Sequence, residues 1–381
     1  MSTIKGARRV LYELKKNGYE AFIVGGAVRD HLLGMPLTDI DITTNAKPFQ
    51  VSKIFKTKPT GIKYGTVTVF YNNETFEVTT FRIDGPYLDH RHPEQVTFSE
   101  TVIEDVKRRD FTINGLLMNE SLEIMDHVEG KKDIHDKLIR TIGDPLERFS
   151  EDALRILRAF YFQAKLGFLI EKETEHAIQQ SKIRLKDVAM ERILNEMIKI
   201  LKGPALKKAI QSMIRTGVHE VLPGLGKGLS YVSEMDTMPY VDAFFILSFA
   251  LHGYVPKEWP FSNKHRHRYE TAIHLVQQNV YDAYTLYTYG LELSLLANRV
   301  SVLLGKSRNM KQQIEAMYAS LPIQSDLDLK LRAPEMIELS GKKAGAWVKE
   351  MQTQMVIEII HHRLKNEKEA LIDFMKKRLK N

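Results

Sequence analysis

Apolar residues recur every three or four positions over the first 18 residues, a spacing typical of an amphipathic helix that stops at Gly18. The chain then changes to short apolar stretches. EAFIVGG (20–26) has the pattern of a buried strand that ends at a glycine pair. The other predicted strands are rich in β-branched residues and are bounded by turn residues: DIDITT (39–44), GTVTVFYN (65–72), ETFEVTTF (74–81) and EIMDHV (123–128). The first 145 residues therefore predict a mixed α/β domain.

Beyond Pro145 the pattern becomes helical almost throughout, with glycines at the ends of the periodic segments. The predicted helices include SEDALRILRAFYFQAKLGF (150–168), EKETEHAIQQS (171–181), KDVAMERILNEMIKILKG (186–203) and GPALKKAIQSMIRTG (203–217). VDAFFILSFAL (241–251) is far shorter than the roughly 20 apolar residues that span a bilayer, so it predicts a buried helix. The tail 361–381 is strongly charged, which favours a solvated helix face over a nucleic-acid contact. The fold class is α+β: a small mixed sheet, then an all-α remainder.

Composition narrows the class of protein. The chain has 381 residues, of which 43% are hydrophobic, as expected of globular domains with real cores. The net charge of +7 suits a polyanionic partner without requiring one. There is no cysteine, no membrane-spanning run and no apolar signal core at the N-terminus, so we expect a cytoplasmic protein without a membrane partner.

The segment GGAVRDHLLG (25–34) predicts a turn that leads into a short helix, with Gly34 as the helix stop. Glycine lets the backbone approach a ligand closely, and the N–H groups at a helix start attract anions. Gly26 and Arg29 are therefore candidate phosphate-binding residues. The pattern is neither a Walker loop nor Gly-x-Gly-x-x-Gly, and an ordinary turn remains the alternative.

Asp39 and Asp41 are two positions apart, so on a strand their side chains leave the same face, with Cα atoms roughly 6–7 Å apart. Carboxylates that close repel each other unless a cation neutralises them. Divalent metals do so in phosphoryl-transfer sites, and Mg²⁺ prefers such hard oxygen ligands. We therefore predict Asp39 and Asp41 as metal ligands for Mg²⁺. Glu77, on a neighbouring predicted strand, is a candidate third catalytic carboxylate, with a solvent-facing role as the alternative.

Two later segments add candidates. In KRRDFTINGLLMN (107–119) a basic pair precedes a turn rich in helix-capping residues, so Arg109 is suited to a triphosphate or ribose. In EDALRILRAF (151–160) a single helix would place Asp152, Arg155 and Arg158 on one edge. The plain alternative is an intrahelical ion pair between Glu151 and Arg155.

The Asp152–Arg155 pair also has a chemical interpretation. An acceptor-only Asp beside a donor-only Arg complements a base edge that carries an amino group next to an unprotonated ring nitrogen. Cytosine and adenine present that edge, whereas uracil and guanine present the reverse. Such a pair would select CTP and ATP and reject UTP and GTP, whose groups would be left unsatisfied.

These motifs, in the order GGAVRD, TDIDITT, RRDFTIN, EDALRILRA and ERILNEM (191–197), resemble the class II tRNA nucleotidyltransferases, the CCA-adding family related to bacterial poly(A) polymerases. GKKAGAWVKE (341–350) and NEKE (366–369) resemble the tail of its shorter bacterial members. The resemblance implies a nucleotidyltransferase head (1–145), a helical neck with the base-reading helix (146–205), a body (206–310) and a tRNA-binding tail (311–381). It also implies that Asp39 and Asp41 bind the catalytic metals, that Gly26, Arg29 and Arg109 hold the triphosphate and sugar, and that Arg158 contacts the nucleotide.

The implied partners are CTP, ATP and the 3′ end and acceptor/T-arm region of tRNA, with a monomer or homodimer as the assembly. Many relatives carry an arginine where this chain has Tyr161, which puts a nucleotide contact there in doubt. The segment 82–98 corresponds to a loop that helps the switch from C to A addition, and it keeps an Arg-x-Pro sequence at Arg91-His92-Pro93. The alternatives left open are a bacterial poly(A) polymerase and a catalytically inactive RNA-binding protein on the same fold.

Overall fold

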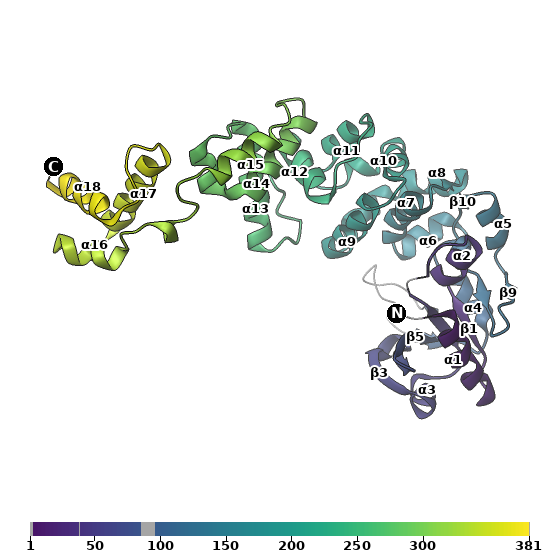
Figure 1. Ribbon diagram of the computed structural model, residues 1–381. Helices are drawn as coiled ribbons and strands as arrows, with labels where there is room; N and C mark the ends of the chain where they lie inside the picture. The colour runs from purple at the N-terminus through teal and green to yellow at the C-terminus, as the bar shows by residue number, and fades with distance from the viewer. Residues whose placement is uncertain (1–2, 38, 85–95, 381) are drawn as a thin grey trace. The chain divides into compact units, whose positions relative to one another are not determined.

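The computed structural model describes residues 3–37, 39–84 and 96–380. The chain forms two compact units, each considered by itself: one comprises residues 1–238 with 258–260, and the other 239–257 with 261–381. Figure 1 shows the sheet in the N-terminal unit and helices alone in the C-terminal one, as the sequence pattern predicts.

The sheet of the N-terminal unit has seven strands in the order β3-β4-β5-β2-β1-β8-β9. Its strands are β1 (Ala21–Val24), β2 (Asp41–Thr44), β3 (Lys56–Gly61), β4 (Thr66–Tyr71), β5 (Glu74–Thr80), β8 (Leu117–Met118) and β9 (Ile124–Met125). The β2–β5 pair is parallel and the other neighbours are antiparallel. The predicted mixed sheet is therefore confirmed. Strand β3 lacks a sequence signal because it is a polar edge strand with a proline, a composition that edges tolerate.

Short helices cover this sheet: α1 (Ile4–Lys16), α2 (Gly26–Leu32), α3 (Pro48–Ile54), α4 (Val102–Lys107), η2 (Thr112–Asn114) and α5 (Gly130–His135). Helix α1 begins at Thr3, whose hydroxyl accepts a hydrogen bond from the Gly6 amide at 3.0 Å. Its apolar face, with Val10 and Leu14, is fully buried, and each such side chain stabilises the fold by roughly 1.5–3 kcal/mol.

The rest of the N-terminal unit is helical: α6 (Pro145–Glu151), α7 (Leu154–Leu166), α8 (Lys172–Ser181), α9 (Met190–Leu201), α10 (Leu206–Arg215) and α11 (Gly226–Ser233). Helix α7 packs against both α9 and α10. Strands β6 (Arg82–Asp84) and β7 (Val96–Phe98) form a separate antiparallel pair. Residues Arg91, His92 and Pro93 of the predicted switching loop lie outside the described residues.

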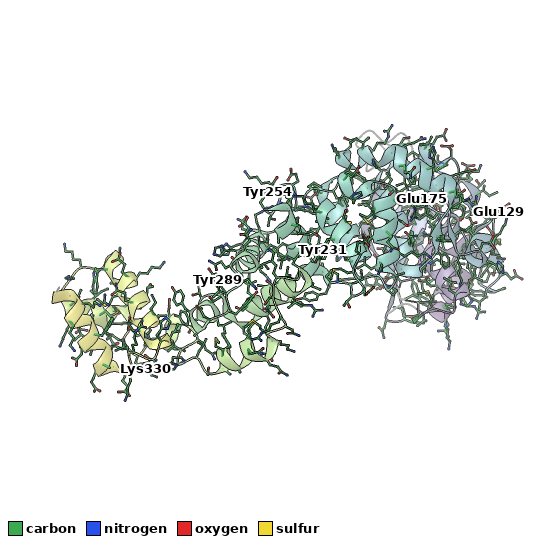
Figure 2. The ribbon with its side chains drawn as sticks, turned by 90° about the horizontal axis from the view of Figure 1, so that it is seen from above. Glu129, Glu175, Tyr231, Tyr254, Tyr289 and Lys330 are labelled. Carbon is green, nitrogen blue, oxygen red and sulfur yellow. The ribbon has the colours of Figure 1, made fainter. Side chains whose placement is uncertain are left out.

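The C-terminal unit consists of α12 (Val241–His252), α13 (Asn263–Gln278), α14 (Ala283–Leu303), α15 (Lys311–Ala319), α16 (Ala333–Ser340), α17 (Ala346–Ile360) and α18 (Lys368–Lys380). Helix α12 is buried from Ala243 to Phe249, as predicted. Tyr254, just beyond it, stands at the surface and is 62% exposed (Figure 2).

Helices α16 to α18 share one apolar core, to which α18 contributes Leu371 and Met375. The charged side chains of α18 from Lys368 to Arg378 are exposed, which fits a solvated helix face and leaves the nucleic-acid alternative a prediction. Across the described residues, no helix has both the length and the apolar character that crossing a bilayer requires. The predicted division at residues 145, 205 and 310 stays a prediction.

Candidate active site

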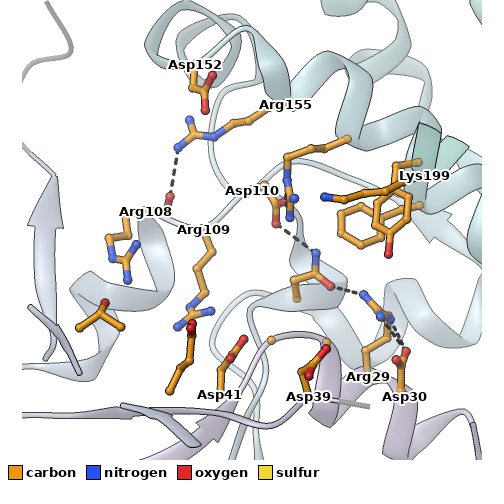
Figure 3. A pocket seen from close by; sticks show the side chains of 18 of the residues that line it. Arg29, Asp30, Asp39, Asp41, Arg108, Arg109, Asp110, Asp152, Arg155 and Lys199 are labelled. Atoms are coloured by element: carbon orange, nitrogen blue, oxygen red, sulfur yellow. Dashed lines mark hydrogen bonds and ion pairs between the residues drawn. The ribbon is translucent and has the colours of Figure 1, made fainter. Parts of the chain in front are cut away.

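A cavity of about 740 Å³ opens in the N-terminal unit between the sheet and the helices that follow it. Eight cationic and six acidic side chains line it, so it carries a positive excess suited to a polyphosphate. The structure brings together every residue predicted for the site: Gly26, Arg29, Asp39, Asp41, Glu77, Arg109, Asp152, Arg155 and Arg158. Asp39 and Asp41 lie on one side of the cavity, and Asp152 and Arg155 lie on the opposite side (Figure 3).

The acidic side of the cavity is built on β2. Asp39 and Asp41 are exposed to it while Ile40 and Ile42 are buried in the core, which confirms that the two carboxylates share a face. Strand β2 begins at Asp41, so Asp39 precedes the strand that the sequence predicted from residue 39. Glu77 is the register partner of Asp41 across the parallel β2–β5 pair.

This crowding changes the acidity of Asp41. Loss of hydration in the cavity raises the pKa of Asp41; the Glu77 and Asp39 carboxylates raise it further, and Arg109 opposes them. Within the described residues, no three His, Cys, Asp or Glu side chains converge closely enough to hold a metal ion by themselves. The site offers two convergent carboxylates with a third in register, and not a complete protein cage.

The glycine turn lies against two arginines. Gly25 has a φ of 69°, a conformation that favours glycine, and a Cβ there would meet the Arg109 guanidinium at 3.5 Å. A Cβ on Gly26 would lie 3.4 Å from the Arg29 guanidinium. Helix α2 is only seven residues long and ends at Leu32, and Gly34 follows with a φ of 65°, as predicted for the stop. The turn therefore brings bare backbone and two guanidinium groups to one edge of the cavity.

Arg29 belongs to a polar chain that joins the sheet domain to α7. Lys165 donates to Asp30 at 2.9 Å, and Arg29 donates to Asp30 at 2.8 Å and to Asn114 at 2.5 Å. Asn114 donates to Asp110 at 3.1 Å, and Arg158 donates to the other Asp110 oxygen at 2.7 Å. Figure 3 shows the middle of this chain as dashed lines. Both walls of the cavity are thus fixed by one hydrogen-bonded network.

Asp110 is the acceptor at the centre of that network. Burial alone would raise the pKa of Asp110, but the Arg158 charge and the Asn114 amide hold it below its usual value. The helix-capping residues predicted in the turn after Arg109 include Asp110 and Thr112, and no side chain caps η2 in the structure. The Asp110 carboxylate instead accepts from the Phe111 amide at 2.8 Å, from Asn114 nearby, and from Arg158 of a helix more than 40 residues later.

Asp105, which the sequence motifs did not single out, fixes the positions of Arg108 and Arg109. Asp105 is fully buried; it accepts from Arg108 at 2.7 Å and from Arg109 at 3.0 Å. Burial would raise the pKa of Asp105, and the two guanidinium groups lower it. The spacing of Asp105 three and four residues before the basic pair was the signal. The Arg109 Nε is buried and makes no hydrogen bond in the described structure.

The base-reading candidates differ from the single helix that the sequence predicted. Helix α6 ends at Glu151 and α7 begins at Leu154, and Asp152 lies between them with a φ of −144°. The Asp152 carboxylate instead accepts from the Leu154 amide, at the start of α7, at 3.1 Å. Its position is also fixed by Arg192 of α9, which donates to both oxygens at 3.2 and 2.7 Å.

Arg155 is 6% exposed and points at the same cavity. It donates to Glu151 at 2.5 Å, the ion pair that was the plain alternative, and to the backbone carbonyls of Arg148 and Arg108 at 2.9 and 3.2 Å. Helix α7 also presents Phe162, whose ring lies 5.2 Å from the guanidinium carbons of both Arg29 and Arg158. The donor and the acceptor of the proposed base-reading pair are therefore both held by neighbours before any ligand binds.

Comparisons with known proteins agree with these observations. A family model described as the poly A polymerase head domain matches residues 21–140. A probable RNA and SrmB-binding site of polymerase A matches 167–228, and a putative tRNA nucleotidyltransferase domain 2 matches 246–375.

Full-length relatives are also found. The chain is 37% identical to a CCA-adding enzyme of Listeria monocytogenes, with 94% of each chain covered, and 37% identical to one of Bacillus cytotoxicus, with 97% of this chain and 98% of that one covered. The crystal structure of the Bacillus stearothermophilus CCA-adding enzyme in complex with CTP matches with a TM-score of 0.87 at 33% identity, covering 100% of this chain and 98% of that one. The Thermotoga maritima CCA-adding enzyme complexed with tRNA shares the fold, with a TM-score of 0.66 at 18% identity over 97% of this chain and 94% of that one.

Proposed function

The chain belongs to the CCA-adding enzyme family of nucleotidyltransferases, and we propose that it adds cytidine, cytidine and adenosine to tRNA 3′ ends from CTP and ATP without a nucleic-acid template. One observation carries the proposal: in a single cavity, the side that carries Asp39 and Asp41 lies opposite the Asp152–Arg155 pair. The two carboxylates suit transfer of a nucleotidyl group, and the Asp152–Arg155 pair suits selection of a base.

In the proposed reaction the terminal 3′ hydroxyl of the RNA attacks the α-phosphate of the nucleotide. A bond forms between O3′ and the α-phosphorus, the bond to the bridging oxygen breaks, and pyrophosphate leaves with the electron pair. Arg29 and Arg109, at the glycine turn, are suited to bind the phosphates. Asp152 accepts from the exocyclic amine of the base while Arg155 donates to its ring nitrogen.

Mg²⁺ fits the acidic side of the cavity. Mg²⁺ is usually bound through one or two carboxylates, with substrate phosphates completing its shell, and Asp39 and Asp41 supply that number. The pKa of Asp41 is raised by loss of hydration first and by the Glu77 and Asp39 carboxylates next, and a bound cation would favour the ionised form of Asp41 against both. Bound there, Mg²⁺ offsets the charge that develops on the transferred phosphate and the leaving group.

Extension of a tRNA that lacks its CCA end tests the proposal. With CTP and ATP together the product grows by three nucleotides and stops, and with CTP alone it stops after two. An open-ended adenosine tract would instead identify a poly(A) polymerase, and no extension with intact RNA binding would identify an inactive RNA-binding protein. A cytoplasmic setting, which rests on the absence of cysteine, is part of the same proposal.

A further inference from the structure

Lys199 differs from the other basic residues that line the cavity. The other cations that line the cavity are buried or partly buried: Arg29, Arg82, Arg108, Arg109, Arg155, Arg158 and Lys165. Lys199 extends from α9 toward the cavity, in the direction of Asp110 (Figure 3), and its side chain is 51% exposed. It is thus the cation best placed to meet a ligand that enters.

Glu196, one turn earlier on α9, fixes the position of Lys199. Its side chain is only 3% exposed, and one of its carboxylate oxygens accepts from the Lys199 ammonium at 3.0 Å. The other oxygen is buried and has no hydrogen-bond partner in the described structure. A buried carboxylate with one unsatisfied oxygen holds a nearby cation strongly, because losing it would leave the charge uncompensated.

Tyr161 supplies the second contact. The Lys199 ammonium lies 5.6 Å from the centre of the Tyr161 ring, within the range of a cation–π interaction. Tyr161 also lines the cavity and follows Arg158 by one turn of α7. At residue 161, α7 therefore presents the Tyr161 ring, and the positive charge beside that ring is the Lys199 ammonium of α9.

We propose that Lys199 is a phosphate-binding residue of this active site, held in place by Glu196 and Tyr161. An ammonium has three donors, and Glu196 takes one of them, so the remaining N–H groups are available to a ligand. The proposal rests on the proposed function for the ligand itself. Two sources offer the same chemistry: the triphosphate of the incoming nucleotide and the phosphodiester backbone of the RNA end.

The main experiment compares Lys199→Met with wild type in steady-state extension of tRNA lacking CCA. If the triphosphate is the ligand, KM for CTP rises about tenfold, which matches one lost hydrogen bond to a charged group. If the RNA backbone is the ligand, KM for tRNA rises instead, and its dependence on salt becomes shallower. Lys199→Arg retains most of the binding in either case. Unchanged KM values for both substrates would overturn the proposal.

A double variant separates phosphate binding from simple neutralisation of Glu196. In Glu196→Gln/Lys199→Met the charges of Lys199 and of its buried partner Glu196 are removed together, so no carboxylate on α9 is left without its lysine. If Lys199 serves only to neutralise Glu196, the double variant regains wild-type KM values and the proposal fails. If Lys199 binds phosphate, the double variant keeps the defect of Lys199→Met. Lys202→Met, an exposed lysine just beyond α9, is the matched control and leaves both KM values unchanged.

Binding of CTP in the absence of RNA, measured by calorimetry on the same variants, keeps this proposal distinct from the proposed function. If wild type fails to make CCA ends, the proposed function fails. A weaker affinity of Lys199→Met for CTP, or for tRNA measured in the same way, would still support the phosphate contact, and equal affinities for both in that case would overturn it.

Discussion

Asp41 and Glu77 are register partners on the parallel strands β2 and β5, so two acidic side chains from different strands share one edge of the cavity. At Asp41 the Arg109 guanidinium opposes this negative charge. The acidic side of the cavity, where we propose that Mg²⁺ binds, is therefore crowded with negative charge in the protein alone, and three consequences can be measured.

Changing Asp41 to Asn abolishes nucleotide incorporation, by about 10³-fold or more, because a ligand of the proposed Mg²⁺ is lost. Binding of tRNA, measured by gel shift, stays close to wild type. Retained activity would contradict the metal assignment.

The same variant gains stability when no metal is present. A carboxyl whose pKa is raised by folding destabilises the folded state at pH values above that pKa, and this cost disappears as pH falls through it. In metal-free buffer at pH 8 we expect the Tm of Asp41→Asn to exceed that of wild type by on the order of 1–3 °C. The difference narrows in acid and on addition of Mg²⁺ to wild type. An equal Tm at pH 8 would argue against repulsion at this site.

Changing Glu77 to Gln shifts the pH dependence of catalysis. The Glu77 charge raises the pKa of Asp41, so its removal lowers that pKa. Asp41 then stays ionised, and able to bind metal, at lower pH, and the acid limb of the kcat/KM profile moves to lower pH. Glu74→Gln, on the same strand but outside the cavity, serves as the control and leaves the profile in place.

Substitutions in the proposed base-reading pair, Asp152 and Arg155, are expected to change which nucleotide is incorporated. In Asp152→Asn the side chain gains an N–H donor, which suits the carbonyl of uracil, so incorporation of UTP relative to CTP rises about 10- to 100-fold. Single-nucleotide extension with each of the four nucleotides measures it. Glu147→Gln, an exposed change on α6, leaves selectivity unchanged. Selectivity that survives both Asp152→Asn and Arg155→Ala would refute the base-reading role.

Arg192 acts through Asp152. Because its guanidinium holds both carboxylate oxygens, Arg192→Met frees Asp152 to rotate, and discrimination against UTP falls in the same direction as in Asp152→Asn. Arg184→Met, an exposed arginine before α9, is the matched control. A loss of stability with unchanged selectivity would reduce Arg192 to a structural role.

The ion pair of Asp110 with Arg158 is expected to make the free energy of unfolding depend on pH in a defined way. Its folded pKa is depressed, so its ion pair with Arg158 contributes stability that is fully present above its unfolded pKa, about 3.9, and is lost as pH falls through the folded value. We expect Asp110→Asn to lower the free energy of unfolding by about 1–3 kcal/mol between pH 5 and 8, with a smaller difference below pH 4. Denaturant titrations at several pH values measure this. Asp136→Asn, an exposed carboxyl paired with His135, gives no comparable loss.

Much of the site could be predicted because its local patterns are strong. The alternation of buried and exposed positions around Ile40 and Ile42 predicted that Asp39 and Asp41 share one face. The same alternation in β5 made Glu77 a candidate third carboxylate. The helix break at Asp152 could not be predicted, because the residues around it have good helical periodicity. Its conformation depends on Arg192, whose position 40 residues later is fixed only by the packing of α9 on α7.

The network through Asp30, Asn114 and Asp110 escaped prediction for the same reason. Each of these residues, taken locally, reads as a cap or a turn residue. They form one chain between Arg29 and Arg158 only because α2, η2 and α7 pack together in the folded protein.

The Phe162 ring under both Arg29 and Arg158 has a kinetic consequence. An aromatic ring neither titrates nor responds to salt, so it keeps these two guanidinium groups in place across a wide range of conditions. With Arg29 and Arg158 binding the nucleotide as proposed, an enzyme that adds several nucleotides in succession gains from this preorganisation, because the two charges need little reorganisation between one addition and the next.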